Sequence, residues 1–421
     1  MSVHWGGPGA GHVSRWSVAT TGVPVLSLDF LTSNTLDPRV TFTRSTTATF
    51  VGSNGLLQTA AINAPRFDYD PITLAAKGLL IEEQRVNLVL RSEEFGDVAW
   101  GKTGSTVTSN AIAAPDGATT ADKLVEDTST GAHAASQFAP LAMAAYVFSI
   151  FVKAGERTKI QFNGGGFGGL GFVAIFDVSN GTMVTNTGGR GSITPAGNGW
   201  YRCSVSFTTL NIVTVAWLMV NGSNSSSYTG DGTSGLYLWG AQYEVGSFIT
   251  SYIPTVASQV TRTADLASMT GTNFSSWYNQ AQGTFVASYE TSPNTFTTYL
   301  AASNGVVAQN SMHMDNDGSG NMRAAYYSGS SAVALLSLGV VGTIGAVNRV
   351  SSAYRVNDFA ASRNGAATVT DTLGAVPVGV TQLNIGADPS GIAANVSNRC
   401  IRSITYYASR LTDSQLQALS T

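Results

Sequence analysis

Hydrophobic and polar positions alternate along most of this chain with a period of two, and helical spacing is nearly absent. Short runs rich in Val, Ile, Phe, Tyr and Thr are separated, roughly every 8–12 residues, by clusters of Gly, Asn, Asp and Ser. The run 146–153 is apolar almost throughout, which indicates a central strand, and 172–177, 213–220 and 236–242 are further strands. The pattern is typical of antiparallel β-sandwiches, and no short repeat points to a β-helix or a propeller.

One convincing helix closes the chain, over residues 411–419. Thr412 and Gln415 have the spacing of a capping box, in which each side chain binds the backbone N–H of the other residue. Leu411 before the cap and Leu416 inside the helix form the matching hydrophobic staple. The sequence therefore predicts an all-β fold that ends in one short helix docked on a sheet.

Shifts in composition divide the chain into three parts. Residues 1–88 contain strand fragments interrupted by prolines, and we expect them to form an irregular, extended N-terminal block. Residues 89–262 are a continuous series of strands and turns, with Pro254 stopping the last strand. Residues 263–421 hold a second series. We therefore expect two antiparallel β-sandwiches, of jelly-roll or lectin-like type, in series after the N-terminal block.

Composition excludes several classes of function. Charged residues make up 11% of the 421 positions, whereas ordinary soluble domains carry roughly 25%. The net charge of −3 leaves no basic field for nucleic acid, so we expect no nucleic-acid partner. Cys203 and Cys400 are assigned to different domains and are predicted to be unbridged, and so few cysteines fit synthesis in a reducing cytoplasm. The N-terminal sequence shows no signal-peptide pattern.

The stretch 331–347 is uncharged and resembles a membrane span at first sight. Gly339, Gly342 and Gly345 interrupt it, and its apolar part is shorter than the roughly 20 residues that a bilayer requires. Short strands around glycine turns explain this composition better. We therefore expect no membrane insertion.

Motifs that would carry catalysis or bind a nucleotide lack their structural context. Residues 96–103 match the phosphate-binding loop pattern, but a β-prone run follows where a helix is needed. Two dinucleotide-type glycine patterns, 164–169 and 230–235, lead into strands rather than helices. No hydrolase motif stands out, so we assign no catalytic residue, no organic cofactor and no enzyme activity.

Three sets of residues carry a resemblance to known proteins. The first set comprises residues 42–50, 54–58, 65–70, 78–87 and 91–95, with Trp100. The second set comprises residues 198–203, 228–242 and 250–254. The third set comprises residues 353–365 and 402–419. The chain from about residue 42 onward resembles head spike fibre and tail fibre proteins of tailed phages and phage-like particles. Its middle part is similar to a carbohydrate-binding module, and its third set looks like a laminin-G or concanavalin A-type sandwich.

The resemblance implies a non-enzymatic virion surface protein that attaches to host cell-surface polysaccharide. Residues 1–88 carry many prolines and isolated apolar runs that are too sparse for a core of their own, so we expect this block to attach the protein to other virion proteins and to support a homo-oligomer. The resemblance implies a trimer as first choice. The protein would be made in the host cytoplasm and located on the particle. Two alternatives stay open, a purely structural capsid decoration or adaptor protein and a polysaccharide depolymerase. The seven Trp and fifteen Tyr offer rings for sugar stacking, although Trp217 and Trp239 are expected in the core.

One acidic cluster in the third part suits a ligand. Asp315, Asn316 and Asp317 begin a pattern like that of a calcium loop, but Tyr326 stands where a bidentate glutamate is expected. The same residue types are also those that a tight hairpin turn requires. Either this segment is an ordinary turn, or the three side chains bind sugar hydroxyls directly or through calcium held by Asp315 and Asp317.

Overall fold

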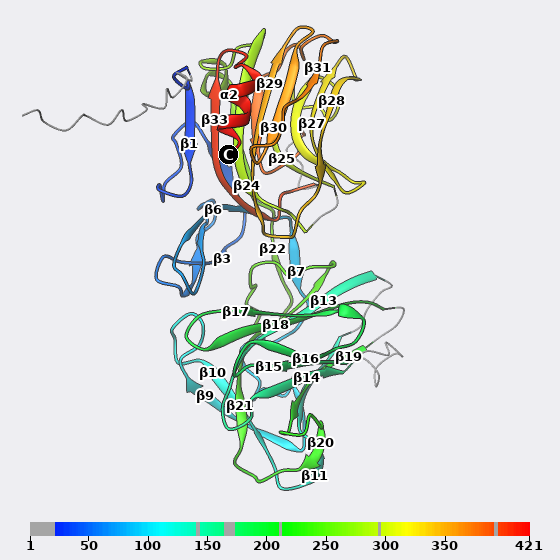
Figure 1. Cartoon of the computed structure of the whole chain (residues 1–421). Coiled ribbons are helices and arrows are strands. Elements are labelled where there is room, and N and C mark those ends of the chain that lie inside the picture. The colour runs from blue at the N-terminus through cyan, green and yellow to red at the C-terminus, as the bar shows by residue number, and fades with distance from the viewer. Residues whose placement is uncertain (1–21, 140–143, 164–172, 210–212, 294–295, 391–394) are drawn as a thin grey trace, which may run out of the picture.

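The chain folds into two β-sandwiches that lie end to end (Figure 1). The computed structural model describes residues 22–139, 144–163, 173–209, 213–293, 296–390 and 395–421. Every strand pairing recorded among these residues is antiparallel, as in the pair formed by β24 (Gln282–Glu290) and β33 (Arg399–Tyr407). The prediction of an all-β fold with one short C-terminal helix is confirmed.

One sandwich, here called the terminal sandwich, takes strands from both ends of the chain. Its first sheet contains β31 (Val369–Asp371), β30 (Phe359–Arg363), β29 (Val347–Arg355), β24, β33, β6 (Ala76–Ile81) and β5 (Phe67–Tyr69), with β1 (Leu26–Asp29) also on β33. Its second sheet contains β2 (Thr41–Thr43), β23 (Leu266–Thr270), β32 (Gln382–Ile385), β25 (Phe296–Ser303), β26 (Ser311–Asp317), β27 (Asn321–Ser328) and β28 (Ser331–Val340).

The other sandwich, here called the inserted sandwich, is formed by the middle of the chain. Its first sheet contains β17 (Gly191–Pro195), β18 (Trp200–Thr209), β13 (Ala144–Lys153), β21 (Gly235–Val245), β10 (Ala121–Glu126) and β9 (Ser105–Ile112). Its second sheet contains β16 (Thr182–Asn186), β15 (Val173–Asp177), β14 (Lys159–Asn163), β19 (Val213–Val220), β12 (Ala134–Ala139) and β8 (Gly101–Thr103).

Smaller elements complete the fold. They are the strand pairs β3 (Ala48–Val51) with β4 (Leu57–Ala60), β7 (Arg85–Asn87) with β22 (Val260–Arg262) and β11 (Thr130–Ala132) with β20 (Ser227–Thr229), the helices α1 (Thr272–Ser275) and α2 (Asp413–Leu419), and a 3-10 turn, η1 (Thr187–Gly189). The chain passes between the sandwiches along β7 and β22, which pair with each other (Figure 1).

The N-terminal segment does not form the separate block that we expected. β1 and β6 both pair with β33, and β2 pairs with β23, so this segment completes both sheets of the terminal sandwich. Its apolar side chains, such as Leu28, enter the same core as Phe285. The reason is that a short strand gains its backbone hydrogen bonds from a free sheet edge and then buries its apolar side chains between the two sheets, and here the edges are provided by strands distant in sequence. The inserted sandwich therefore lies in the chain between β6 and β23 of the terminal sandwich, and it is not the first of two domains in series.

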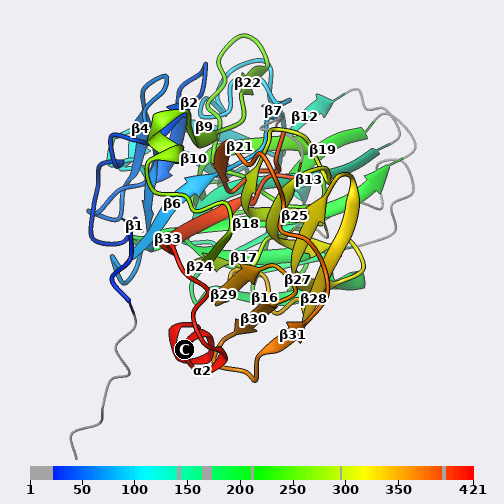
Figure 2. The ribbon, with the colours of Figure 1, turned by 90° about the horizontal axis from the view of Figure 1, so that it is seen from above.

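The helix prediction is confirmed in detail. Thr412 Oγ1 accepts the backbone N–H of Gln415, and the Gln415 side chain accepts the backbone N–H of Thr412. Leu411 and Leu416 are buried in one small cluster under the helix. Seen from above, α2 lies beside β29 and β30 (Figure 2).

The uncharged stretch after residue 330 forms β28, the edge strand of its sheet. Among the described residues, no helix is long and apolar enough to cross a membrane.

We expect two thiols that react only after unfolding. Cys203 and Cys400 are buried and unbridged, one in each sandwich, as predicted. Burial raises the pKa of both thiols, which disfavours the reactive thiolate. A thiol reagent should therefore modify no cysteine in the folded protein and two cysteines in guanidinium. Modification of fewer than two cysteines in denaturant, or rapid reaction of the native protein, would contradict this assignment.

Candidate functional site

The three residues that we singled out as a sugar or calcium site lie at the end of β26. Asp315 and Asn316 are 1% and 0% exposed, because both faces of this central strand are covered. Only residues 318–320 lie between β26 and β27. Asp315 and Asn316 therefore belong to the strand and are buried, and of the three residues only Asp317 stands at the hairpin turn.

The carboxylates of this cluster are already occupied. The Asp315 oxygens accept from Nε and Nη2 of Arg323 at 2.8 and 3.1 Å. Asp317 Oδ1 accepts the backbone N–H groups of Ser319 and Asn321 at 2.8 and 3.0 Å, as a turn residue does. A calcium ion here would have to displace Arg323, so the donors do not suit calcium as they are arranged. Across the described ranges, no three His, Cys, Asp or Glu side chains gather as metal ligands would.

Asp315→Ala is expected to act on stability rather than on ligand binding. The change leaves the Arg323 guanidinium without its partner, and we expect a loss of about 1.5–3 kcal/mol in the free energy of unfolding. Asp317→Ala should cost less, about 0.5–1.5 kcal/mol, because water replaces the lost turn contacts. Urea unfolding of both variants measures this. Unchanged stability with lost glycan binding in Asp315→Ala would restore the loop site.

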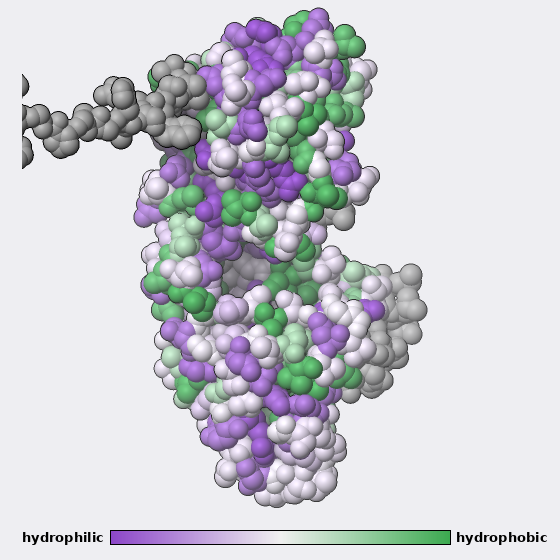
Figure 3. Space-filling model, in the orientation of Figure 1, coloured by the Kyte–Doolittle hydropathy of each residue, from purple (hydrophilic) through white to green (hydrophobic). Residues whose placement is uncertain are grey.

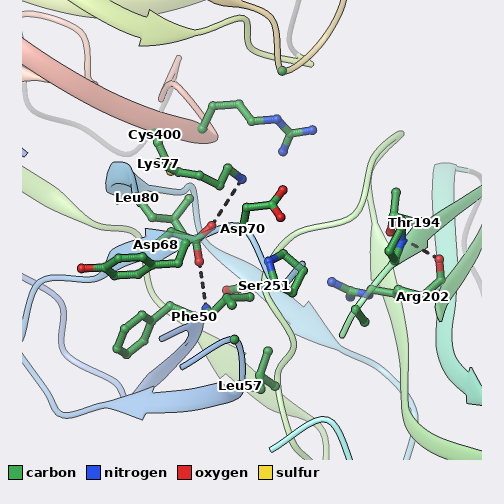
Figure 4. Close-up of a pocket in the computed structure, with 18 of the residues that line it drawn as sticks. Phe50, Leu57, Asp68, Asp70, Lys77, Leu80, Thr194, Arg202, Ser251 and Cys400 are labelled. Carbon is green, nitrogen blue, oxygen red and sulfur yellow. Dashed lines mark hydrogen bonds and ion pairs between the residues drawn. The ribbon is translucent and has the colours of Figure 1, made fainter. Parts of the chain in front are cut away.

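A larger candidate site is the pocket between the two sandwiches, here called the inter-lobe pocket. Its volume is about 680 Å³, within the usual range for ligand sites of about 300–1,000 Å³. Figure 3 shows the surface hollowed at mid-height, where the sandwiches meet. Strands β5, β6 and β33 supply one wall and β17 and β18 supply the opposite wall, with Ser251 lying between Asp68 and Arg202 (Figure 4).

Partly exposed rings give this pocket an apolar surface. Phe50 and Tyr69 are half-buried and line it, together with Pro71 and Pro195. The tryptophans, in contrast, are not available for sugar stacking in the described part of the chain. Those described are all buried, namely Trp100, Trp200, Trp217, Trp239 and Trp277. The core role predicted for Trp217 and Trp239 is confirmed, whereas the partly exposed rings at the pocket belong to Phe50 and Tyr69.

A short row of charged groups crosses the pocket wall of the terminal sandwich. Lys77 Nζ lies 3.4 Å from Asp68 Oδ2 and 3.7 Å from Glu290 Oε2. Burial raises the pKa of the Asp68 and Glu290 carboxyls, and the Lys77 charge only partly offsets this effect. Asp68 Oδ1 also accepts the backbone N–H of Val51 at 2.8 Å, which attaches the β3–β4 hairpin to this wall.

The opposite wall is held by Arg202. Its Nη1 donates to the backbone oxygen of Thr250 at 2.7 Å, and Nε and Nη2 donate to Ser149 Oγ. The guanidinium also lies over the Phe151 ring, 5.2 Å from its centroid. These contacts fix the side chain, so this wall is preorganised rather than open to rearrangement.

Beside the pocket, a buried ion-pair network joins the two sandwiches. Glu82 Oε2 lies 2.8 Å from Arg66 Nη1 and 2.9 Å from Arg262 Nη1. Ser251, on the segment leaving the inserted sandwich, donates its backbone N–H and its hydroxyl to Glu82 at 2.8 and 2.6 Å. Asp265 pairs with Arg66 and lies 3.0 Å from Nη1 of Arg44, which is also buried.

Sequence reasoning missed this junction. Arg44, Arg66, Glu82 and Ser251 all fall inside the stretches that carry the family resemblance, yet we attached no role to them. The available signal was that Arg66 and Glu82 adjoin apolar residues of predicted strands, because charged residues at such positions are rarely buried unless paired. Nothing local indicated that they meet each other.

No protein-family model matches the sequence, and no curated protein does. Among solved structures, the CBM40 of the Ruminococcus gnavus IT-sialidase, bound to α2,3-sialyllactose, is 21% identical with a TM-score of 0.30, covering 34% of this chain and 83% of that one. The NanB sialidase of Streptococcus pneumoniae is 15% identical with a TM-score of 0.31, covering 37% of this chain and 26% of that one.

Mouse laminin α1 domains LG4-5 are 10% identical with a TM-score of 0.25, covering 76% of this chain and 92% of that one. At such TM-scores these matches do not assign a function. None of the three is described as a virion protein.

Proposed function

We propose that this protein binds polysaccharide in the inter-lobe pocket, and that it does so as a non-enzymatic surface component of a virion. The observation that carries the binding proposal is the pocket itself. It combines half-exposed Phe50 and Tyr69 rings with hydrogen-bonding groups on two rigid walls. Aromatic faces that stack on sugar rings, with polar groups for the hydroxyls, are what a saccharide site requires.

The virion part of the proposal rests on the resemblance of residues 42–421 to spike and fibre proteins. Those stretches contribute Arg66, Glu82 and Ser251 to the junction beside the pocket. The buried ion pairs of this junction hold the two sandwiches in one arrangement. Such rigidity suits a surface protein that presents a ligand site between them.

Blocking the pocket tests the binding proposal. Thr194 is exposed on β17 and lines the pocket, so the ring of Thr194→Trp should obstruct part of it and reduce glycan binding at least about tenfold. Ser192→Trp places the same ring on the same strand outside the pocket and serves as the control. Binding to a glycan array and to host surface polysaccharide is measured for both, with thermal melts to verify folding. Equal binding by wild type and Thr194→Trp would reject the pocket as the site.

The two alternative functions give different results. A purely structural decoration protein binds no glycan on the array or on host cells. A depolymerase releases new reducing ends from host polysaccharide, and such release would overturn the non-enzymatic proposal.

Immunogold labelling of intact particles tests the virion location, and sedimentation analysis of the full chain tests the proposed trimer.

A further inference from the structure

Two arginines on the pocket wall form no close ion pair with any described residue, although their charges act on the Glu290 carboxylate from a distance. Arg399 and Arg402 are half-buried on β33 and both line the inter-lobe pocket. Arg399 Nη1 donates to the backbone oxygen of Asn398, 3.1 Å away. Within the described ranges, the Arg402 guanidinium has no hydrogen-bond or ion-pair partner, and no carboxylate lies within 4.0 Å of either guanidinium. Each guanidinium carries five N–H donors, so most of theirs remain for water or a ligand.

The backbone holds Arg402 in this position by a β-bulge. Ser403 pairs with Ser288 and Ile401 pairs with Tyr289, so Arg402 is an extra residue between two pairs. Arg402 also lies between the two strands that pair with the other side of β33. There β6 pairs with residues 399–401 and β1 pairs with residues 403–406. Bulges of this kind redirect a side chain, and here the redirected residue lines the pocket.

The carboxylates that line the same pocket are already engaged. Glu82 is in the buried network, and Asp70 Oδ1 accepts the N–H groups of Ile72 and Thr73 at 2.9 and 2.8 Å. Asp68 and Glu290 share Lys77, and the charges of Arg399 and Arg402 also favour the ionised form of Glu290 and so counter the rise in its pKa. Of the charged groups that line the cavity, the two guanidinium groups therefore keep the most N–H donors without a partner among the described residues. Guanidinium groups match planar carboxylates with two parallel hydrogen bonds.

We infer that the saccharide bound in the inter-lobe pocket is acidic, with a sugar carboxylate held by Arg399 and Arg402. This inference rests on the proposed function, because it names the substrate class of the same site. Phe50 and Tyr69 would contact the sugar ring while the two guanidinium groups bind its acid group. A neutral polysaccharide leaves these arginines without a charged partner and binds less well.

The test uses the full chain with polygalacturonate and with the same polymer after its carboxyl groups are reduced to alcohols. The wild type should bind the acidic polymer at least about tenfold more tightly, and rising salt should weaken that binding. Arg399→Gln with Arg402→Gln should remove the preference. The control is Arg349→Gln with Arg355→Gln, which removes the same charge from exposed positions of β29 in the same sandwich and should change little.

Each outcome separates the two proposals. Loss of the preference in the pocket double variant but not in the control supports the acidic class. An unchanged preference in that variant overturns it. If the wild type binds both polymers equally and Thr194→Trp abolishes that binding, the pocket is the site but the acidic class is rejected. If Thr194→Trp binds as well as the wild type, the pocket itself is rejected. If the Gln variant does not fold, Arg399→Lys with Arg402→Lys keeps both positive charges. Lysine cannot make the paired hydrogen bonds of a guanidinium to a carboxylate, so the preference for the acidic polymer should still fall several-fold. An unchanged preference in that Lys variant would equally overturn the inference.

Discussion

Glu82→Gln is expected to lower the free energy of unfolding by about 3–5 kcal/mol, the usual cost of removing one partner from a buried ion pair. Glu82 is 4% exposed and is the shared acceptor of Arg66, Arg262 and Ser251. The neutral amide occupies nearly the same volume but leaves two buried guanidinium charges with less compensation. Because Ser251 belongs to the inserted sandwich segment, the loss should also loosen the contact between the sandwiches.

The acid dependence of stability gives this prediction a second readout. Burial by itself raises the pKa of Glu82, but Arg262, Arg66 and the Ser251 hydrogen bonds outweigh it and hold that pKa well below its ordinary value of 4.5. Because this pKa is lower in the folded than in the unfolded protein, ionised Glu82 stabilises the fold above the unfolded-state pKa. That stabilisation is lost as the pH falls toward the folded-state pKa. The wild type should therefore lose stability below about pH 4.5, and the Gln variant should lose less over that range.

Urea unfolding between pH 3 and 7 measures both effects, with Glu94→Gln as the control. Glu94 pairs with Arg91 at 2.9 Å, but its side chain is 50% exposed, so its loss should cost under about 1 kcal/mol. If the two variants unfold at the same urea concentration, the network does not stabilise the junction.

Gly78→Ala is expected to cost about 3 kcal/mol or more, by combining about 1–3 kcal/mol of backbone strain with about 1–3 kcal/mol of overpacking. Gly78 has a φ of +116°, which only glycine adopts readily. An added Cβ would lie 2.3 Å from the Ile401 backbone oxygen and 3.0 Å from Arg402 Cα. Neither atom belongs to a flexible side chain, so the backbone of β33 would have to move at the bulge that positions Arg402.

Gly320→Ala separates the two causes. Gly320 also has a positive φ, of +87°, but no atom lies within 4 Å of the added Cβ. This control should lose only about 1 kcal/mol. Thermal or urea unfolding compares the two, and equal losses would mean that the close approach to β33 contributes nothing.

Local pattern was sufficient for much of the fold. Alternation with a period of two identified strands such as β13, and a short capping motif at Thr412 and Gln415 identified α2. The buried, unbridged state of Cys203 also followed from its place on an apolar strand face. These features depend on neighbours within a few residues, so the sequence by itself determines them.

Tertiary structure decided the topology and the candidate site. Alternation shows which face of a strand is buried, but not which strand lies beside it, so the pairing of β1 and β6 with β33 could not be read from sequence. For the same reason Asp315, taken for a loop ligand, proved to be a buried partner of Arg323. The inter-lobe pocket unites residues as distant as Tyr69, Thr194 and Arg402. Contacts across such separations arise only when whole sheets pack, because the free energy that favours them comes from burying complete faces rather than from any local segment.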